Sequence, residues 1–507
     1  MQPGAPIGIP HGMMLVSPEP APLTPPPSNL QMARPSRPWR MYGRVVGLVV
    51  LLFFFEQFVA GGWIIALEGD ALYGAFCMIF AIPMMLAVVA LRRPRVVLLE
   101  RAVPDSSGQQ LHMITTQQGS LQTPMPTRMD RHLLRDDSIL DVPASSTAWI
   151  IFAITVLFAI GLSIMLALNI GFWLAAILII PTVLVGFSIP VMGWWSHSTK
   201  RIGLPTRRRD AEAWLMAGIL SGLPAIMING WLFPGIITGI LPSISDDNLL
   251  YLTVIISAPV GEEICKAAAI WFFASKIRSP KHGFQIGFTV GLGFAIIENL
   301  MYISESSLGL GFSLTILIRG IGSIPGHAFW TGLTGAAMGW TIMRSRAASL
   351  QMAAEAGHQI MAPEKKSSDW KLIDSDTGQV VGSETAVGSG VAVTPSGVQM
   401  WVPAQNIISK KPWLTVPLPE KIVVGLLLAM LGHATWNGSG ILLLMIANDI
   451  GMSDITYILL EILLIIVLVI AVLLLGSGLL HSVRAAPDGS EVDDYQAQLA
   501  TMTQQRF

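Results

Sequence analysis

The chain is poor in charge and almost without cysteine. Only 12% of its 507 residues are charged, about half the share that soluble globular proteins carry. Its two cysteines, Cys77 and Cys265, both lie in apolar stretches, so the sequence offers neither a disulfide framework nor a cysteine-type zinc site. The net charge is −1, whereas nucleic-acid-binding proteins usually have an excess of basic residues, so we expect no nucleic-acid partner.

Two common hydrolase signatures are absent as well. No Gly-x-Ser-x-Gly elbow occurs, which argues against catalysis by a serine or cysteine nucleophile. No His-Glu-x-x-His pattern occurs either, so zincin-type spacing gives no support for a metal. Any hydrolytic chemistry in this chain must therefore come from a different arrangement of residues.

What the sequence has in abundance is long apolar runs. Hydrophobic residues make up 52% of the chain, and the mean hydropathy is +0.61. Ten runs are long enough to cross a hydrocarbon core of about 30 Å as helices. They cover 45–67, 71–91, 147–168, 170–195, 211–240, 249–274, 284–304, 312–343, 420–447 and 454–480. We therefore predict an all-α polytopic membrane protein with about ten transmembrane helices in the lipid bilayer.

The charges between these runs predict the orientation. With a cytoplasmic N-terminus, alternation of the runs places the basic segments in the cytoplasm, and the opposite turns contain no Lys or Arg. We therefore expect a multi-pass protein of the cell (cytoplasmic) membrane with both termini in the cytoplasm. The sequence does not predict an oligomeric state.

The predicted parts follow one another along the chain. They are a disordered Pro-rich cytoplasmic tail (1–40), two transmembrane helices (41–91), a polar cytoplasmic insert (92–146), a transmembrane helix pair (147–210), the first part of a candidate catalytic membrane core (211–344), a second cytoplasmic insert (345–419), the last two helices of that core (420–482) and a cytoplasmic tail (483–507). Val96–Leu99 is expected to form a short strand in the first insert. Alternating residues near 390–393 and 398–402 are typical of a small β element in the second.

Two adjacent glutamates, Glu262 and Glu263, lie within the 249–274 run. Each charge at the centre of a membrane helix costs about 2.5–3.5 kcal/mol, so a purely structural helix has no reason to contain two. Lys266 follows one turn later and can pair with either glutamate. A buried ion pair that only fixes packing is the alternative, but intramembrane ionisable residues are by default hypotheses of function.

Three later runs each contain one more Glu or His at similar depth, namely Glu298, His327 and His433. At 1.5 Å per residue, these three and Glu262 lie about 18–22 Å from one end of their helices. Residues at middle depth on consecutive antiparallel helices most simply form one polar cluster. Glycines repeat every four residues from 283 to 291, which predicts close packing of the 284–304 helix against a neighbour.

Further polar residues lie inside the predicted helices. Asn437 shares a face with His433 at i+4, and Asn299 follows Glu298 directly. Arg319 and Lys266 are the only Lys or Arg residues in the interior of the runs, since Lys421 lies at the very start of its run. For the remaining mid-run polar residues we favour a structural role: Glu56, Asn169, Asn229 and Glu461.

Peptide hydrolysis is a reaction that such a set can serve. It needs an activated water, a proton donor for the leaving amine and a stabiliser for the oxyanion. Adjacent glutamates can differ in protonation, one acting as base and the other as proton carrier or orienter, and His and Asn can donate to an oxyanion. The same residues could instead hold a divalent metal such as zinc. A proton- or cation-coupled transporter that uses them as a relay is the alternative function, and a scaffold is a third.

At these residues the sequence resembles a known family. Glu262-Glu263-x-x-Lys266, Phe294-x-x-x-Glu298-Asn299, His327 and His433-x-x-Trp436-Asn437 are similar to the motif series of the PrsW family of intramembrane proteases. That family is related to the group that includes the CAAX prenyl endopeptidases. The resemblance covers roughly 210–450 and implies proteolysis of a membrane-anchored protein substrate. In bacterial members it implies cleavage of an anti-sigma factor.

The resemblance also implies roles for individual residues. The catalytic candidates are Glu262, Glu263, Glu298, His327 and His433. Residues expected to bind substrate or support the site are Lys266, Asn299, Asn437 and Arg319. The candidate metal ligands are Glu263, Glu298, His327 and His433, although the residues leave open whether such enzymes use a metal. CAAX-type sites usually have Arg at position 266 and His at 298, so Lys266 and Glu298 argue against prenyl-protein processing.

Overall fold

The computed structural model describes residues 36–94, 96–104, 113–116, 119–122, 127–135, 138–306, 309, 311–355, 391–393, 399–401 and 414–489. They fall into two compact units, one that includes 89–139 and one that includes 37–88 and the chain from 140 onward. Most of the tail predicted at 1–40, most of the 345–419 insert and the end of the C-terminal tail lie outside the described residues.

The smaller unit contains antiparallel strand pairs. Strand β1 (Val96–Pro104) pairs with β4 (Thr127–Arg135), with Val96 opposite Arg135. Strand β2 (Met113–Thr116) pairs with β3 (Gly119–Gln122). The short strand predicted in this insert is thus confirmed and is longer than expected. In the other unit β5 (Val391–Val393) pairs with β6 (Gln399–Trp401), which confirms the small β element expected in the second insert.

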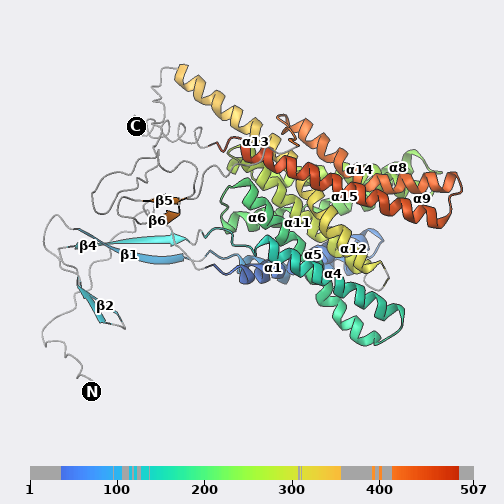
Figure 1. Cartoon of the computed structure of the whole chain (residues 1–507), viewed down its shortest axis with the longest axis horizontal. Coiled ribbons are helices and arrows are strands. Elements are labelled where there is room, and N and C mark those ends of the chain that lie inside the picture. The colour runs from blue at the N-terminus through green and yellow to red at the C-terminus, as the bar shows by residue number, and fades with distance from the viewer. Residues whose placement is uncertain are drawn as a thin grey trace. The chain divides into compact units, whose positions relative to one another are not determined.

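The larger unit is a bundle of helices (Figure 1). Its helical elements are α1 (Pro38–Leu67), α2 (Ala71–Ile79), α3 (Ala81–Leu91), α4 (Ser145–Ala167), α5 (Phe172–Ile202), α6 (Arg208–Leu220), α7 (Gly222–Met227), η1 (Ile228–Leu232), α8 (Phe233–Ile240), α9 (Asp246–Leu252), η2 (Thr253–Ser257), α10 (Ala258–Trp271), η3 (Ala274–Lys276), α11 (Pro280–Ser306), α12 (Phe312–Ile318), η4 (Arg319–Ser323), α13 (Ile324–Glu355), α14 (Ile422–Asp449) and α15 (Asp454–Ala485). Helices α4 and α5 are separated by a tight turn in which Asn169 and Gly171 have φ of 54° and 62°. Asn and Gly tolerate this left-handed backbone better than other residues do.

Within the described residues, nine helical segments are long and apolar enough to cross a membrane. Each corresponds to one of the ten predicted runs, so the all-α polytopic fold is confirmed. The tenth run, 312–343, is helical but less hydrophobic than the others. The reason is its position, because every residue from Gly322 to Gly339 is buried. A helix enclosed by protein does not need apolar side chains toward lipid.

Helices α11 and α13 pack backbone against backbone at the glycine repeat. A Cβ atom added at Gly287 would lie 2.4 Å from the Thr331 carbonyl oxygen, and one added at Gly291 would lie 2.4 Å from that of His327. Only glycine permits this approach, so the predicted close packing is confirmed. The contact fixes the height of His327 against α11, the helix that also contains Glu298.

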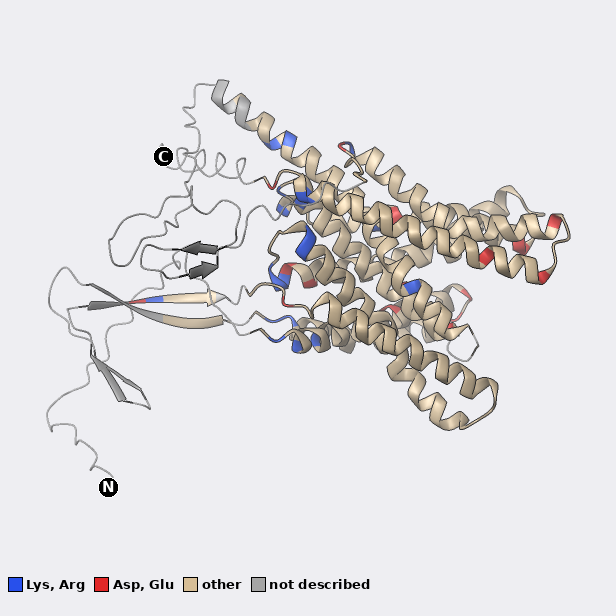
Figure 2. Ribbon diagram, viewed as in Figure 1, with Lys and Arg blue, Asp and Glu red and all other residues tan. Residues whose placement is uncertain are grey.

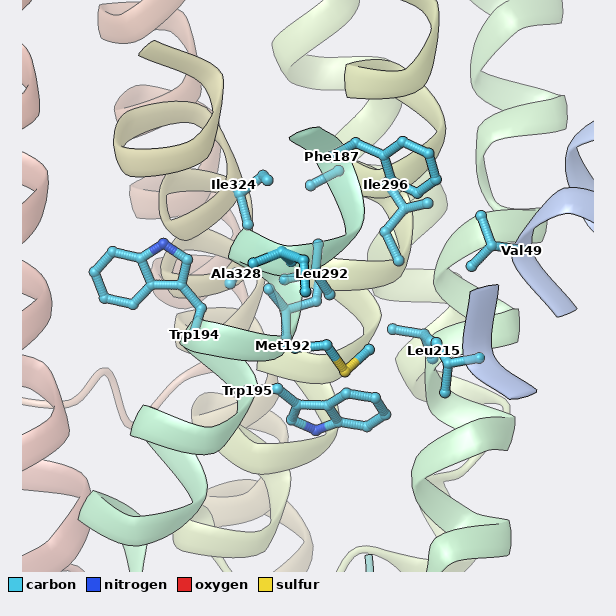
Figure 3. Packing of buried hydrophobic residues seen from close by; sticks show 14 of the residues in the cluster. Val49, Phe187, Met192, Trp194, Trp195, Leu215, Leu292, Ile296, Ile324 and Ala328 are labelled. Carbon is cyan, nitrogen blue, oxygen red and sulfur yellow. The ribbon is translucent and has the colours of Figure 1, made fainter. Parts of the chain in front are cut away.

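A hydrophobic cluster surrounds these two helices (Figure 3). Its members include Val49 of α1, Phe187 and Met192 of α5, Leu215 of α6, Leu292 of α11 and Ala328 of α13, all buried. A close-packed interior transmits small displacements instead of absorbing them. The cluster therefore provides a rigid frame for the polar residues of α11 and α13.

Charged residues are distributed unevenly along the bundle. Lys and Arg gather at one end of the helices, whereas the described turns at the other end contain acidic residues and no Lys or Arg (Figure 2). At the basic end Arg44 of α1 binds Glu212 of α6, with Nε 2.6 Å from Oε1. This distribution matches the segments that the sequence analysis assigned to the two sides of a membrane.

Candidate active site

Four helices bring the five catalytic candidates together. Glu262 and Glu263 lie on α10, Glu298 on α11, His327 on α13 and His433 on α14. Glu263, His327 and His433 are 0–1% exposed, and Glu262 is 8% exposed. The polar cluster predicted from the helix depths therefore exists, and it lies inside the bundle.

Glu263 is the most enclosed of the carboxylates. Its Oε1 accepts a hydrogen bond from Lys266 Nζ at 2.8 Å and lies 3.2 Å from His433 Nδ1. Its Oε2 accepts one from Thr331 Oγ1 at 3.3 Å. A carboxylate only accepts, so the ring proton of His433 sits on Nδ1, according to the hydrogen-bond network. Glu263 thereby fixes both the orientation and the tautomer of His433.

Glu262 has two differently placed oxygens. Its Oε1 accepts a hydrogen bond from Asn229 Nδ2 at 3.3 Å. Its Oε2 lies 3.5 Å from Lys266 Nζ and 3.7 Å from His433 Nε2. This Nε2 atom is buried and has no hydrogen-bond partner among the described residues. One oxygen of Glu262 therefore faces an unused ring nitrogen across a gap too long for a direct hydrogen bond.

His327 forms the second histidine–carboxylate pair. Its Nδ1 lies 2.9 Å from Lys266 Nζ, and its Nε2 lies 2.5 Å from Glu298 Oε2. Because the ammonium of Lys266 only donates, Nδ1 accepts, and the ring proton lies on Nε2, next to the Glu298 carboxylate. The Lys266 ammonium also lies 3.7 Å from the centre of the Phe294 ring, a favourable cation–π contact.

Residues 211–361 match the model of the PrsW family of intramembrane metalloproteases. This part of the chain is similar to the PrsW family. No curated protein and no solved structure matches the chain. The PrsW-type match includes α10, α11 and the whole of α13, and with them Glu262, Glu263, Glu298 and His327. His433 lies beyond the matched residues, and the structure places it at the same site.

The donor atoms of the PrsW-type site fit a metal ion. Glu262, His327 and His433 each offer one ligand atom, and these atoms lie within 4.8 Å of one another. Two histidines and a glutamate are a known zinc ligand set. A metal-binding histidine usually has a carboxylate next to its other ring nitrogen, and here Glu263 lies next to His433 Nδ1 and Glu298 next to His327 Nε2. Binding would require His327 Nδ1 to exchange its contact with Lys266 for the metal. Of the four metal ligands expected from the sequence, His327 and His433 belong to this group. Glu263 and Glu298 do not, because each contacts a histidine ring instead. The third donor is Glu262, which was not expected as a ligand.

Aromatic rings fix the planes of both histidines. The Trp330 ring stacks on His433, with centroids 5.3 Å apart and 16° between the planes, and meets His327 edge-on at 5.5 Å. Gly432, directly before His433, makes room for Trp330, because a Cβ there would lie 2.5 Å from the indole Nε1. The rings thus hold the PrsW-type site in one geometry.

The four supporting residues expected from the sequence differ in their contacts with the site. Lys266 contacts Glu262, Glu263 and His327. Arg319 Nη1 lies 3.0 Å from Glu298 Oε1, and its guanidinium stacks over Tyr302. Within the part of the chain that the structure describes, the Asn299 side chain donates to the Ala295 carbonyl of its own helix, at 2.5 Å, and reaches none of the site residues. Asn437 is half-buried one turn from His433, and its side chain makes no hydrogen bond to another described residue.

Sequence reasoning missed several members of the site. Asn229 was assigned a structural role, yet it contacts Glu262, while Thr331 and Trp330 hold Glu263 and His433. Asn229 was detectable as a polar residue in the middle of an apolar run. Thr331 and Trp330 follow His327 by one turn, but nothing in the spacing indicates which partners they meet.

Proposed function

We propose that this protein is an intramembrane endopeptidase that hydrolyses peptide bonds of membrane-anchored proteins, with Glu262 as the residue that meets the attacking water. The observation that carries the proposal is the pair of atoms Glu262 Oε2 and His433 Nε2, which face each other at 3.7 Å within the PrsW-type domain. A water molecule can bridge polar atoms that are too far apart for a direct hydrogen bond. Glu262 is also more exposed than Glu263, which is already occupied by three partners.

The chemical step uses the residues in distinct roles. Glu262 accepts a proton from the water at Oε2 while the water oxygen bonds to the carbonyl carbon of the substrate. The same carboxyl group then delivers this proton to the amine nitrogen as the C–N bond breaks. Lys266, held between both glutamates, compensates their negative charge. Asn437, which has no partner of its own in the described chain, is free to donate to the oxyanion.

The family description implies a metal, and the donor set fits one. Glu262, His327 and His433 would hold it, with Glu263 and Glu298 orienting the two rings, and Glu262 would then bind the ion in place of acting as the base. A divalent ion such as zinc, when bound, supplies a Lewis acid that activates water and polarises the carbonyl.

The substrate and the orientation are part of the same proposal. The basic end of the bundle supports a cytoplasmic position for both termini in the cell membrane. A site enclosed among membrane helices supports a substrate with a membrane-embedded or juxtamembrane cleavage site. An anti-sigma-factor type of substrate is the class that the motif resemblance favours.

Cleavage of a membrane-anchored reporter by the purified protein in liposomes tests the proposal. The double variant Glu262→Gln plus Glu263→Gln should lose about 10²–10⁴-fold in rate, the contribution of general acid–base catalysis. The matched control is Glu461→Gln, which changes a half-buried intramembrane glutamate on α15 outside the site and should keep its activity. Equal cleavage by the wild type and the double variant would refute the proposal. Proton flux driven by a solute, without cleavage, would instead favour the transporter.

A further inference from the structure

Two π-helical turns lie next to the proposed catalytic glutamate. They are η1 (Ile228–Leu232) and η2 (Thr253–Ser257), and η2 leads directly into α10. A π-turn inserts one extra residue into a helix and often marks a functional site. Here η1 contains Asn229 and η2 ends at Ser257, and Ser257 Oγ donates to Asn229 Oδ1 at 2.8 Å.

This contact gives Asn229 a fixed orientation. Since a carboxylate only accepts, the Nδ2 group faces Glu262 Oε1 at 3.3 Å, and the amide oxygen on the other side accepts the Ser257 hydroxyl. Gly261 lets the two helices approach, because a Cβ there would lie 2.9 Å from Ile228 Cγ2 and 3.4 Å from Asn229 Oδ1. Ser257, Asn229 and Glu262 therefore form a directional hydrogen-bond chain.

The Ser257 hydroxyl behaves differently from other hydroxyls in these helices. Thr253 Oγ1 donates to the Leu249 carbonyl at 2.8 Å, and Ser221 Oγ donates to the Gly218 carbonyl at 2.6 Å, both within their own helical segment. That local bond is the usual arrangement for Ser and Thr in a helix. Ser257 instead directs its hydroxyl to a side chain on another helix, which serves the orientation of Asn229.

We propose that Asn229, oriented by Ser257, is a positioning residue that holds Glu262 Oε1 and leaves Oε2 as the working oxygen. A glutamate side chain has three rotatable bonds, and a reacting group must be held to within a fraction of an ångström. With Oε1 bound to Asn229, Oε2 faces Lys266 Nζ at 3.5 Å and His433 Nε2 at 3.7 Å. The inference rests on the proposed function in its assignment of Glu262 to the attacking water.

The test compares kcat and KM for variants of the two positioning side chains. Asn229→Ala should lower kcat about 10–100-fold, the typical cost of losing an outer partner of a site residue, with KM changed less than about threefold. Asn229→Asp should do no better although its shape is the same, because a carboxylate cannot donate to Glu262. Ser257→Ala should lose less, and Ser257→Thr should restore activity, since it keeps the hydroxyl. The control Ser221→Ala removes a buried serine hydroxyl that does not belong to the Ser257–Asn229–Glu262 hydrogen-bond chain, and its kcat should match that of the wild type.

A second readout does not depend on proteolysis. In a double-mutant cycle of Asn229→Ala and Glu262→Ala, the unfolding equilibrium should show coupling of about threefold, the average for hydrogen bonds between membrane helices. Additive effects in this cycle, or an Asn229→Asp variant with wild-type kcat, would overturn the inference. If the wild type cleaves no reporter, the proposed function fails, while the cycle still decides whether Asn229 holds Glu262.

Discussion

The substitution Gly291→Ala tests whether helix packing sets the catalytic geometry. The added Cβ would lie 2.4 Å from the His327 carbonyl oxygen and 2.8 Å from the Ala328 Cα, whereas ordinary van der Waals contact begins near 3.4 Å. Both neighbours are backbone atoms that cannot rotate away. Helices α11 and α13 must therefore separate by about 1 Å at this point to reach ordinary van der Waals distance.

The consequence at the site follows from a single contact. Glu298 Oε2 of α11 and His327 Nε2 of α13 lie 2.5 Å apart, and an additional 1 Å would bring the two atoms to the limit of hydrogen-bonding distance. Overpacking of this kind costs about 1–3 kcal/mol of stability, and a misplacement of about 1 Å can cost about 100-fold in rate. We therefore expect Gly291→Ala to fold with reduced stability and to cleave about 100-fold more slowly.

The assay is kcat for a membrane-anchored reporter together with the unfolding midpoint in detergent. The matched control is Gly47→Ala on α1, where an added Cβ would meet no heavy atom within 4 Å and should slightly favour the helix. A Gly291→Ala variant with the kcat of the Gly47→Ala variant would refute the reasoning, because the backbone contact would then not control the position of His327.

Two further predictions concern charge and metal at the site. Lys266 is fully buried between Glu262, Glu263 and His327, so Lys266→Met should destabilise the protein by about 3–5 kcal/mol, as expected when one partner of a buried ion pair is removed. Lys266→Arg should retain more stability but less than full activity, since its planar head does not match the site; equal unfolding free energies for Met and Lys would contradict the pairing. Removal of bound metal with a chelator should abolish cleavage, and added zinc should restore it. Undiminished cleavage by metal-free protein would assign water activation to Glu262 alone.

Much of the architecture follows from local properties of the sequence. A membrane-spanning helix needs only a sufficient length of apolar residues, so the runs predicted nine of the segments that the structure shows as candidate spans. Spacing within one helix was equally reliable. Lys266 follows Glu262 and Glu263 by one turn, so the predicted ion pairs form wherever this segment is helical. The tenth run shows the limit, since the polarity of 312–343 makes sense only for a helix enclosed by others.

Tertiary structure alone decided how the polar residues are paired. Spacing places a residue on a face of its helix but does not define how far that helix is rotated or shifted against its neighbours. In this protein those variables are set by packing, such as Gly291 against the His327 backbone and Gly432 against Trp330. Only that packing determines that Glu263 holds His433, that Asn229 reaches Glu262, and that Asn299 remains bonded within its own helix.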